Sequence, residues 1–226
     1  MSHESHRTEP PVDPAEFWED RYRSTRGEHG QVWSGRVNEA VQREVSGLRP
    51  GTALELGCGE GGDALWLAEQ GWSVTAIDIS STALAVGAAE AERAGLSERI
   101  RWIQADLATW RPSAEFDLVT TAFLHSPVEL PREEVLRRAA MAVAPGGRLL
   151  VVGHGAVPPG SKLSHHEQNG PPLPTPGKVL ASLHLAADWV TETNALVERP
   201  AVWRDGSAVT LVDAVLRVRR GPGPDA

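Results

Sequence analysis

The chain has 226 residues, 41% of them hydrophobic, which is enough to bury one sizeable core but leaves no room for a second full domain. Its net charge of −8 argues against a nucleic-acid partner, because binding to DNA or RNA draws most of its affinity from Lys and Arg. The sequence has no apolar run of membrane-spanning length, residues 1–13 lack an apolar signal core, and the single cysteine, Cys58, excludes an internal disulfide, so we expect a cytoplasmic protein with no membrane partner.

The first part of the chain predicts a tail followed by two helices. Residues 1–13 are polar and charged, and we expect them to be disordered. Amphipathic spacing predicts a helix over 14–23 and another over 36–46, before the Pro50-Gly51 pair ends this lead-in.

From residue 52 onward, short apolar runs alternate with helical patterns, and this rhythm is typical of a parallel sheet. The predicted strands lie near 52–57, 73–78, 99–105, 115–121 and 146–153, and the predicted helices near 61–70, 81–94 and 131–142.

The last third of the chain predicts a loop and a closing hairpin. Segment 156–177 is rich in Pro and Gly and too long for a simple connection, so we expect a substrate-side lid or a mobile loop there. Two β-rich runs follow, 189–203 and 208–219, and the Asp-Gly pair between them predicts a hairpin. The arginines gathered at Arg217, Arg219 and Arg220 are expected on a solvated strand edge.

The most informative stretch is ALELGCGEGGD, residues 53–63, which is followed by a second strand that ends at Asp78. Glycines let a backbone turn tightly against a ligand, and an acid at the end of the next strand can accept hydrogen bonds from two ribose hydroxyls. The pattern therefore predicts a nucleotide-type cofactor site. Gly57, Gly59 and Gly62 also satisfy the dinucleotide pattern G-x-G-x-x-G, so a nicotinamide cofactor stays open at this point.

The spacing Glu55-x-Gly57-x-Gly59-x-Gly61 resembles the first motif of class I S-adenosylmethionine-dependent methyltransferases. Three further segments are similar to the family's third strand, its fourth strand and its turn into strand five: 100–107, 115–121 and 144–152. The resemblance implies an α/β, doubly wound (Rossmann-like), mostly parallel seven-stranded sheet with an antiparallel C-terminal hairpin and an N-terminal helical cap. It also implies S-adenosylmethionine as the cofactor.

Within this family a single domain is expected over 14–220. Its parts are a helical cap (14–50), a cofactor-binding core (51–154), a substrate-side loop and helix (155–187) and a closing hairpin (188–220). The cofactor-binding residues that the resemblance implies are Trp33, Glu55, Gly57, Cys58, Gly59, Gly61, Asp78, Ile79, Asp106, Leu107 and Ala122. Among these, Asp106 corresponds to the acid that contacts adenine, and we interpret Cys58 as a small spacer in the turn rather than a nucleophile.

The lead-in FWEDRY, residues 17–22, followed by WSGRVN, residues 33–38, resembles the cap of the thiopurine, thiol and tellurite-resistance branch of small-molecule methyltransferases. In that branch a tryptophan closes over the cofactor, which is the basis for including Trp33. The acceptor is then expected to be a small molecule, with a thiol or other chalcogen nucleophile as one option, and the protein to be a monomer or a homodimer.

A sulfonium methyl group is already a strong electrophile, so the main task of such an enzyme is to align the acceptor with it. A general base is needed only when the acceptor carries a proton at attack. His125, after the fourth predicted strand, is the candidate base, although a packing or cofactor-side hydrogen-bonding role is the preferred interpretation. The segment 120–127 lacks the Asn/Asp-Pro-Pro-Tyr signature that resembles DNA-base or amide methylation.

Two other functions and a metal site fit the sequence less well. An NAD(P)-dependent oxidoreductase of the short-chain form would want a Tyr-x-x-x-Lys pair, but the only tyrosine, Tyr22, is followed by Arg26. A non-catalytic S-adenosylmethionine-binding module would be expected to carry a degraded motif, whereas here the motif is complete. We expect no metal, because the available groups lack the spacing of a zinc motif or of clustered carboxylates. Those groups are His154, His165, His166, Glu167, His184 and Asp117.

Overall fold

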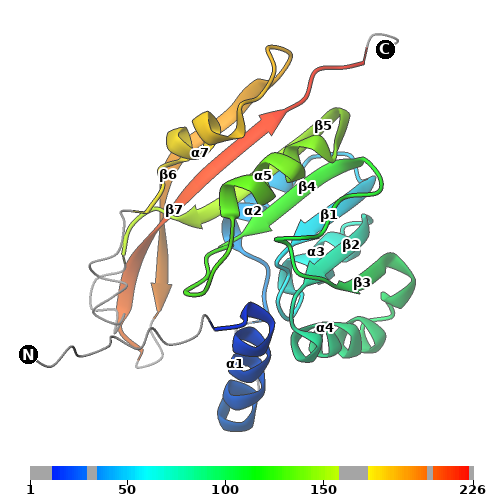
Figure 1. Cartoon of the computed structure of the whole chain (residues 1–226), viewed down its shortest axis with the longest axis vertical. Coiled ribbons are helices and arrows are strands. Elements are labelled where there is room, and N and C mark those ends of the chain that lie inside the picture. The colour runs from blue at the N-terminus through cyan, green and yellow to red at the C-terminus, as the bar shows by residue number, and fades with distance from the viewer. Residues whose placement is uncertain (1–11, 30–34, 158–172, 203–205, 224–226) are drawn as a thin grey trace, which may run out of the picture.

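The computed structural model describes residues 12–29, 35–157, 173–202 and 206–223 and contains one seven-stranded sheet of order β3-β2-β1-β4-β5-β7-β6 (Figure 1). The first five strands in this order run parallel, and β7 runs antiparallel between β5 and β6. The strands are β1 (Thr52–Leu56), β2 (Ser73–Asp78), β3 (Ile100–Gln104), β4 (Phe116–Ala122), β5 (Val143–His154), β6 (Val190–Val202) and β7 (Ala208–Arg219). The predicted fold class, including the antiparallel hairpin, is confirmed.

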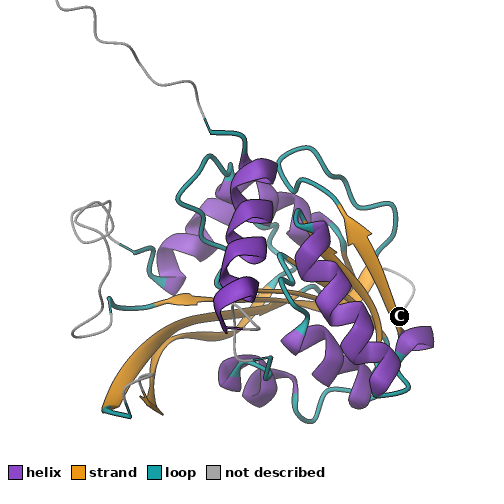
Figure 2. Ribbon diagram, turned by 90° about the horizontal axis from the view of Figure 1, so that it is seen from below, coloured by secondary structure: helices purple, strands orange, loops and turns teal. Residues whose placement is uncertain are grey.

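Helices cover both faces of the sheet, as Figure 2 shows. The helices are α1 (Pro14–His29), α2 (Glu39–Val45), α3 (Gly62–Glu69), α4 (Ser81–Arg93), α5 (Arg132–Met141) and α7 (Pro176–Leu183), with a short 3-10 turn at Ser97–Arg99. Apolar side chains of α2, α3 and α4 pack in one buried cluster, and those of α5 and α7 in the other. No helix in the described part of the chain is long and apolar enough to cross a bilayer.

The central strand β5 has a continuous apolar run because both faces of the sheet are covered there. In β5, Leu149 and Val151 face the α5 and α7 side, whereas Leu150 and Val152 face α2 and α3. All four side chains are at most 2% exposed. This alternation lets the same strand contribute to both halves of the core.

Two predicted helix boundaries differ from the structure. The second helix begins at Glu39 rather than at residue 36, because the Asn38 side chain accepts hydrogen bonds from the amides of Ala40 and Val41 (2.8 and 3.3 Å) and so caps the helix. The first helix continues to His29 instead of ending near residue 23.

The arginines at the end of β7 do not form a solvated strand edge, and that expectation is wrong. β7 lies inside the sheet, since β6 is the strand at its edge. Arg217 and Arg219 both pair with Glu192, at 2.9 and 3.2 Å, and Arg220 pairs with Glu115 at 2.9 Å. The two ion pairs to Glu192 join β7 to β6.

Helix α1 lies beyond the carboxyl ends of the parallel strands, next to α4 (Figure 1). Its Glu19 accepts hydrogen bonds at the start of α4 from the hydroxyls of Ser80 (2.7 Å), Ser81 (3.1 Å) and Thr82, and from the Thr82 amide (3.3 Å). Partial burial would raise the pKa of Glu19, but the hydrogen bonds from Thr82, Ser80 and Ser81 outweigh it and lower the pKa to about 2. The α1 helix is therefore attached to the segment that directly follows Asp78.

Candidate cofactor and acceptor site

The turn between β1 and α3 depends on glycine. Gly57, Gly59 and Gly61 have φ angles of 71°, 54° and 81°, in the left-handed region that residues with a Cβ rarely adopt. A Cβ on Gly61 would also collide with the ring of Trp102. The amides of Gly57 and Cys58 both donate to the Ile77 carbonyl, at 2.8 and 3.0 Å, which ties the turn to the end of β2.

Asp78, at the end of β2, holds the same turn from the side. Its Oδ2 accepts the Gly59 amide at 2.8 Å and its Oδ1 accepts the Ser80 amide at 2.9 Å. Burial raises the pKa of Asp78, while the hydrogen bonds from Ser80 and Gly59 oppose the rise. Each carboxylate oxygen has a further lone pair beyond these bonds, so the side chain can still accept from a ligand.

Glu55 lies beneath the turn, 4% exposed, and its Oε2 has no hydrogen-bond partner among the described residues. Burial raises the pKa of Glu55 well above its ordinary value, and the charges of Asp63 and Asp78 raise it further. Buried carboxylates so close together are costly when ionised unless a cation neutralises them. The site therefore favours a positively charged ligand group.

Asp63, in the first turn of α3, is a member of this acidic group that the sequence analysis did not single out. Its Oδ1 accepts the Asn38 amide at 2.6 Å, and burial raises its pKa to about 6 although that hydrogen bond lowers it. Asp63 thus links the start of α2 to the glycine turn. The available signal was an acid at the first turn of the helix that follows the glycines.

Cys58 is a buried free thiol within the turn. Burial raises the pKa of Cys58 well above its ordinary value, and the nearby Glu55 and Asp78 raise it further. The thiolate is the nucleophilic form of cysteine, so this environment supports the interpretation of Cys58 as a small spacer.

The remaining predicted cofactor residues lie at neighbouring strand ends. Ile79 is half-buried directly after β2, and half-buried Ala122 ends β4. After β3, Asp106 is half-buried and accepts the Ala108 amide at 2.8 Å, whereas the Leu107 side chain belongs to the core on the α5 side. Carboxyl ends of parallel strands meet at one edge of a sheet, so the fold brings these positions to the same edge as the glycine turn.

Several predicted positions lie outside the described residues. These are Trp33 and the loop residues His165, His166 and Glu167. Within the described ranges no three His, Cys, Asp or Glu side chains are grouped to hold a metal ion. Asp117 has a structural role at the opposite edge of the sheet, where its Oδ2 accepts from the Thr52 amide (2.8 Å) and hydroxyl (2.9 Å).

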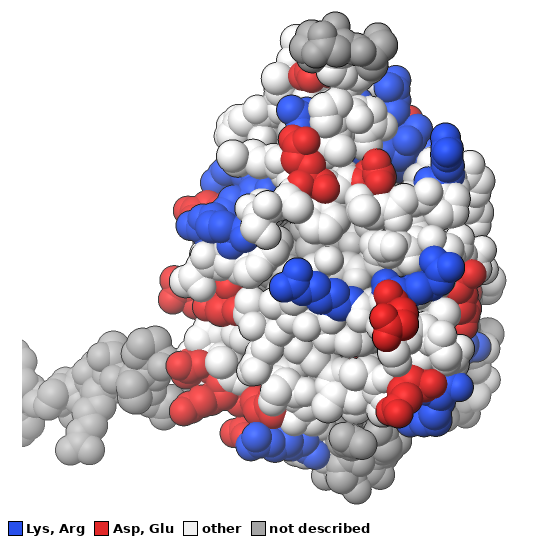
Figure 3. Space-filling view, turned by 90° about the vertical axis from the view of Figure 1, so that its right-hand side faces the viewer, with Lys and Arg blue, Asp and Glu red and all other residues white. Residues whose placement is uncertain are grey.

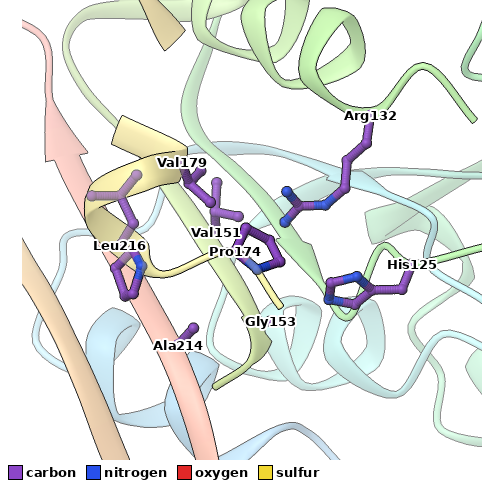
Figure 4. A pocket seen from close by; sticks show the side chains of 9 residues that line it. His125, Arg132, Val151, Gly153, Pro174, Val179, Ala214 and Leu216 are labelled. Carbon is purple, nitrogen blue, oxygen red and sulfur yellow. The ribbon is translucent and has the colours of Figure 1, made fainter. Parts of the chain in front are cut away.

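His125 and Arg132 point toward a narrow cavity between the end of β5 and the start of α7 (Figure 4). Arg132 Nε donates to the Leu124 carbonyl at 2.9 Å, and His125 Nε2 is buried with no partner in the described part of the chain. Burial, together with the neighbouring Arg132 and His154, lowers the pKa of His125 to about 4. The remaining lining residues are Val151, Gly153, Pro174, Pro176, Val179, Ala214 and Leu216.

Comparisons with known proteins agree with this geometry. A family model described as "Methyltransferase domain" matches residues 53–147. The ubiquinone biosynthesis O-methyltransferase of Pseudomonas paraeruginosa is 33% identical over 116 residues, which are 51% of this chain and 49% of that protein. The chain spans between 22% and 60% of the length of the first curated relatives that it matches.

Two solved structures share the fold over almost their whole length. One, from work on the conversion of a disulfide bond into a thioacetal group during echinomycin biosynthesis, has a TM-score of 0.68 at 24% identity and covers 93% of both chains. The other is a Burkholderia thailandensis 1,6-didemethyltoxoflavin N1-methyltransferase with bound 1,6-didemethyltoxoflavin and S-adenosylhomocysteine. It has a TM-score of 0.61 at 20% identity and covers 95% of this chain and 93% of its own.

The sheet order and the glycine turn define a Rossmann-like domain of the methyltransferase class. The matched family model and relatives are methyltransferases, which supports the class I S-adenosylmethionine-dependent methyltransferase resemblance that the motif predicted.

Proposed function

We propose that this protein transfers the methyl group of S-adenosylmethionine to a small-molecule acceptor by direct in-line displacement. The observation that carries the proposal is the carboxylate oxygen of Glu55 beneath the glycine turn, which has no partner in the described ranges and is flanked by Asp63 and Asp78. The amino-acid part of S-adenosylmethionine carries an ammonium group, which is the charge that this site lacks.

The same acidic group argues against a dinucleotide. In the alternative as an NAD(P)-dependent oxidoreductase, the glycine turn would hold a pyrophosphate. Two negative phosphates would then lie against the acidic group of Glu55, Asp63 and Asp78 and would make these carboxyl groups still more costly to ionise. The residues present therefore fit a cationic cofactor better than an anionic one.

Several of the predicted cofactor residues have a defined role in this proposal. The glycine backbone admits the amino-acid part of the cofactor, Glu55 pairs with its ammonium group, Asp78 accepts from the ribose hydroxyls and Asp106 contacts adenine. The bound cofactor supplies an electrophilic sulfonium methyl group. The chain's own task is to hold the acceptor in line and to exclude water, and α1, attached through Glu19, covers this edge of the sheet.

Three observations support a small-molecule acceptor. The net charge is −8, and on the face in Figure 3 Lys and Arg side chains alternate with Asp and Glu rather than forming a basic stretch. The Burkholderia structure holds a small acceptor on the same fold. The structure with a TM-score of 0.68 comes from work on a disulfide converted into a thioacetal, which supports a sulfur nucleophile as the first class to test. A cytoplasmic location and a monomeric or homodimeric state remain predictions.

The test is methyl transfer itself. Purified protein is incubated with methyl-labelled S-adenosylmethionine and a panel of small thiols, phenols and amines, and both labelled product and S-adenosylhomocysteine are measured. We expect transfer to at least one acceptor class, and a large loss in Glu55→Gln but not in Glu69→Gln, an exposed acid at the end of α3. Cofactor binding without transfer to any acceptor would favour the non-catalytic module instead.

A further inference from the structure

His154 and Asp213 lie directly opposite each other at the ends of two strands. They are register partners between β5 and β7, which run antiparallel. Directly opposed residues on antiparallel strands project to the same face with their Cβ atoms about 5 Å apart. His154 is exposed to solvent at the end of β5, at the edge of the sheet that holds the cofactor site.

Asp213 is an acid with an unmet hydrogen-bonding capacity. The residue is 2% exposed. Its Oδ2 accepts from Arg199 Nε of β6 at 2.7 Å, whereas its Oδ1 has no partner among the described residues. A buried carboxylate oxygen without a hydrogen-bond donor is destabilising. We therefore expect a donor to reach Asp213 Oδ1 from the side of His154.

The imidazole of His154 is held in a defined orientation. It stacks on Phe123 with ring centroids 4.4 Å apart and an interplanar angle of 25°, and it lies 5.5 Å from the ring of His125. Phe123 has a φ of 54°, a strained conformation for a bulky residue, and its amide donates to the Val152 carbonyl at 2.8 Å. The strained residue thus covers one face of the imidazole and leaves its edge accessible.

The position of His154 relative to the glycine turn leaves space for an acceptor. The turn follows β1, and the sheet order places β4 between β1 and β5. Neighbouring strands are about 4.8 Å apart and β5 continues past the level at which β1 ends, so the ends of β1 and β5 are separated by about 14 Å. An acceptor above the end of β4 would then lie between the cofactor site and His154.

We propose that His154 is the proton acceptor of the methyl-transfer reaction and that Asp213 positions and stabilises it. The inference rests on the proposed function and names the base for acceptors that carry a proton. The acceptor heteroatom forms a bond to the methyl carbon while the carbon–sulfur bond of the sulfonium breaks and its electron pair stays on sulfur. The acceptor's proton passes to His154, and the imidazolium so formed is stabilised by the carboxylate of Asp213.

The charges around His154 agree with this role. Stacking against Phe123 partly desolvates the ring and lowers the pKa of His154, the carboxylate of Asp213 raises it, and Arg199 lowers it again. His125 and, behind it, Arg132 face the ring from the β4 to α5 side. The lowered pKa leaves the imidazole of His154 free to accept a proton at pH 7. A pKa of about 4 makes His125 a weak base.

The first test needs no turnover. Ring-nitrogen NMR titration gives the pKa of His154 in the wild type, in Asp213→Asn and in Arg199→Gln. We expect the pKa to fall in Asp213→Asn, which removes a negative charge, and to rise in Arg199→Gln, which removes a positive one. Equal values in all three proteins would overturn the positioning role of Asp213.

The second test follows methyl transfer against pH with the thiol, phenol and amine panel. In His154→Gln, kcat/KM for an acceptor that is protonated at the assay pH should fall about 100-fold, whereas transfer to an acceptor that is already ionised should change little. The kinetic pKa of the wild type should match the NMR value and move with it in Asp213→Asn. His184→Asn, an exposed histidine with φ 51° that Asn tolerates, is the matched control.

The outcomes separate this inference from the proposed function. If His154→Gln transfers at the wild-type rate, or if the kinetic pKa stays fixed in Asp213→Asn, the role of His154 is overturned while the methyltransferase function stands. If the wild type binds S-adenosylmethionine and His154→Gln does not, then His154 is a cofactor contact and not the base. If the wild type itself does not bind S-adenosylmethionine, the proposed function fails and this inference with it.

Discussion

Replacing Glu55 with Gln keeps the shape of the side chain and removes its capacity for negative charge. In the free protein this relieves a conflict, because Glu55 is buried beside Asp63 and Asp78 and its Oε2 has no partner in the described residues. In the proposed complex with S-adenosylmethionine, the same change would remove a charged hydrogen bond to the ammonium group. The substitution should therefore have opposite effects on stability and on binding.

The magnitude for binding follows from the kind of contact. A hydrogen bond to a charged group contributes about 2–3 kcal/mol when it is buried, which corresponds to a loss of about 30-fold to about 150-fold in affinity for S-adenosylmethionine. Isothermal titration of wild type, Glu55→Gln and the exposed control Glu69→Gln measures this loss directly.

The effect on stability should depend on pH with a definite sign. Burial holds the pKa of Glu55 well above its ordinary value of 4.5. At pH values between the pKa of the unfolded chain and the pKa of the folded protein, the folded state therefore keeps a proton that the unfolded state has released. The free energy of unfolding of the wild type falls as pH rises through this range. Glu55→Gln lacks this fall, and the advantage of the variant should grow from pH 5 to pH 8 in urea titrations.

Cofactor binding should release a proton for the same reason, because a bound ammonium group favours the ionised form of Glu55. The binding enthalpy in buffers of different ionisation enthalpy then reports the release, and the release should shrink in Glu55→Gln. Unchanged affinity and unchanged proton release in the variant would refute the pairing of Glu55 with the cofactor's ammonium group.

Three further predictions concern the surroundings of the turn. Burial raises the pKa of Asp63 to about 6, so the free energy of unfolding should fall by about 3 kcal/mol as pH rises from about 4 to about 6, and a urea series in which Asp63→Asn shows the same slope would contradict this. Glu19→Ala should release α1 and increase hydrogen exchange in residues 14–25 without affecting the core strands; unchanged exchange there would show that the bonds to Ser80 and Thr82 do not hold the helix. Gly61→Ala should destabilise the protein more than Gly47→Ala, because both positions have positive φ but only Gly61 of the two also faces Trp102. Equal losses of stability in thermal unfolding would show that the contact with Trp102 adds no cost.

Much of the fold could be predicted because its signals are local. The strands and the turn residues Gly57, Gly59 and Gly61 follow one another along the chain, and burial on both faces gives the central strand β5 a continuous apolar run. The first motif places Glu55 and Asp78 at the same edge through a single β-α-β unit. The sequence was therefore sufficient for the core and for its cofactor class.

The acceptor side was not predictable in the same way. His154 meets Asp213 only through the register of β5 on β7, and Glu19 meets Ser80 across 61 residues of chain. The low pKa of His125 depends on burial and on Arg132, which the sequence pattern does not specify. Long-range pairing decides these contacts, and a single sequence carries no local signal for it.

The measurement that tests the central claim most directly is a calorimetric titration of the purified protein with S-adenosylmethionine and S-adenosylhomocysteine, beside NAD and NADP. The acidic group beneath the glycine turn predicts binding of the two sulfur cofactors and no binding of the dinucleotides. Binding of NAD or NADP in their place would contradict the account and would reassign Asp78 to the ribose of a nicotinamide cofactor.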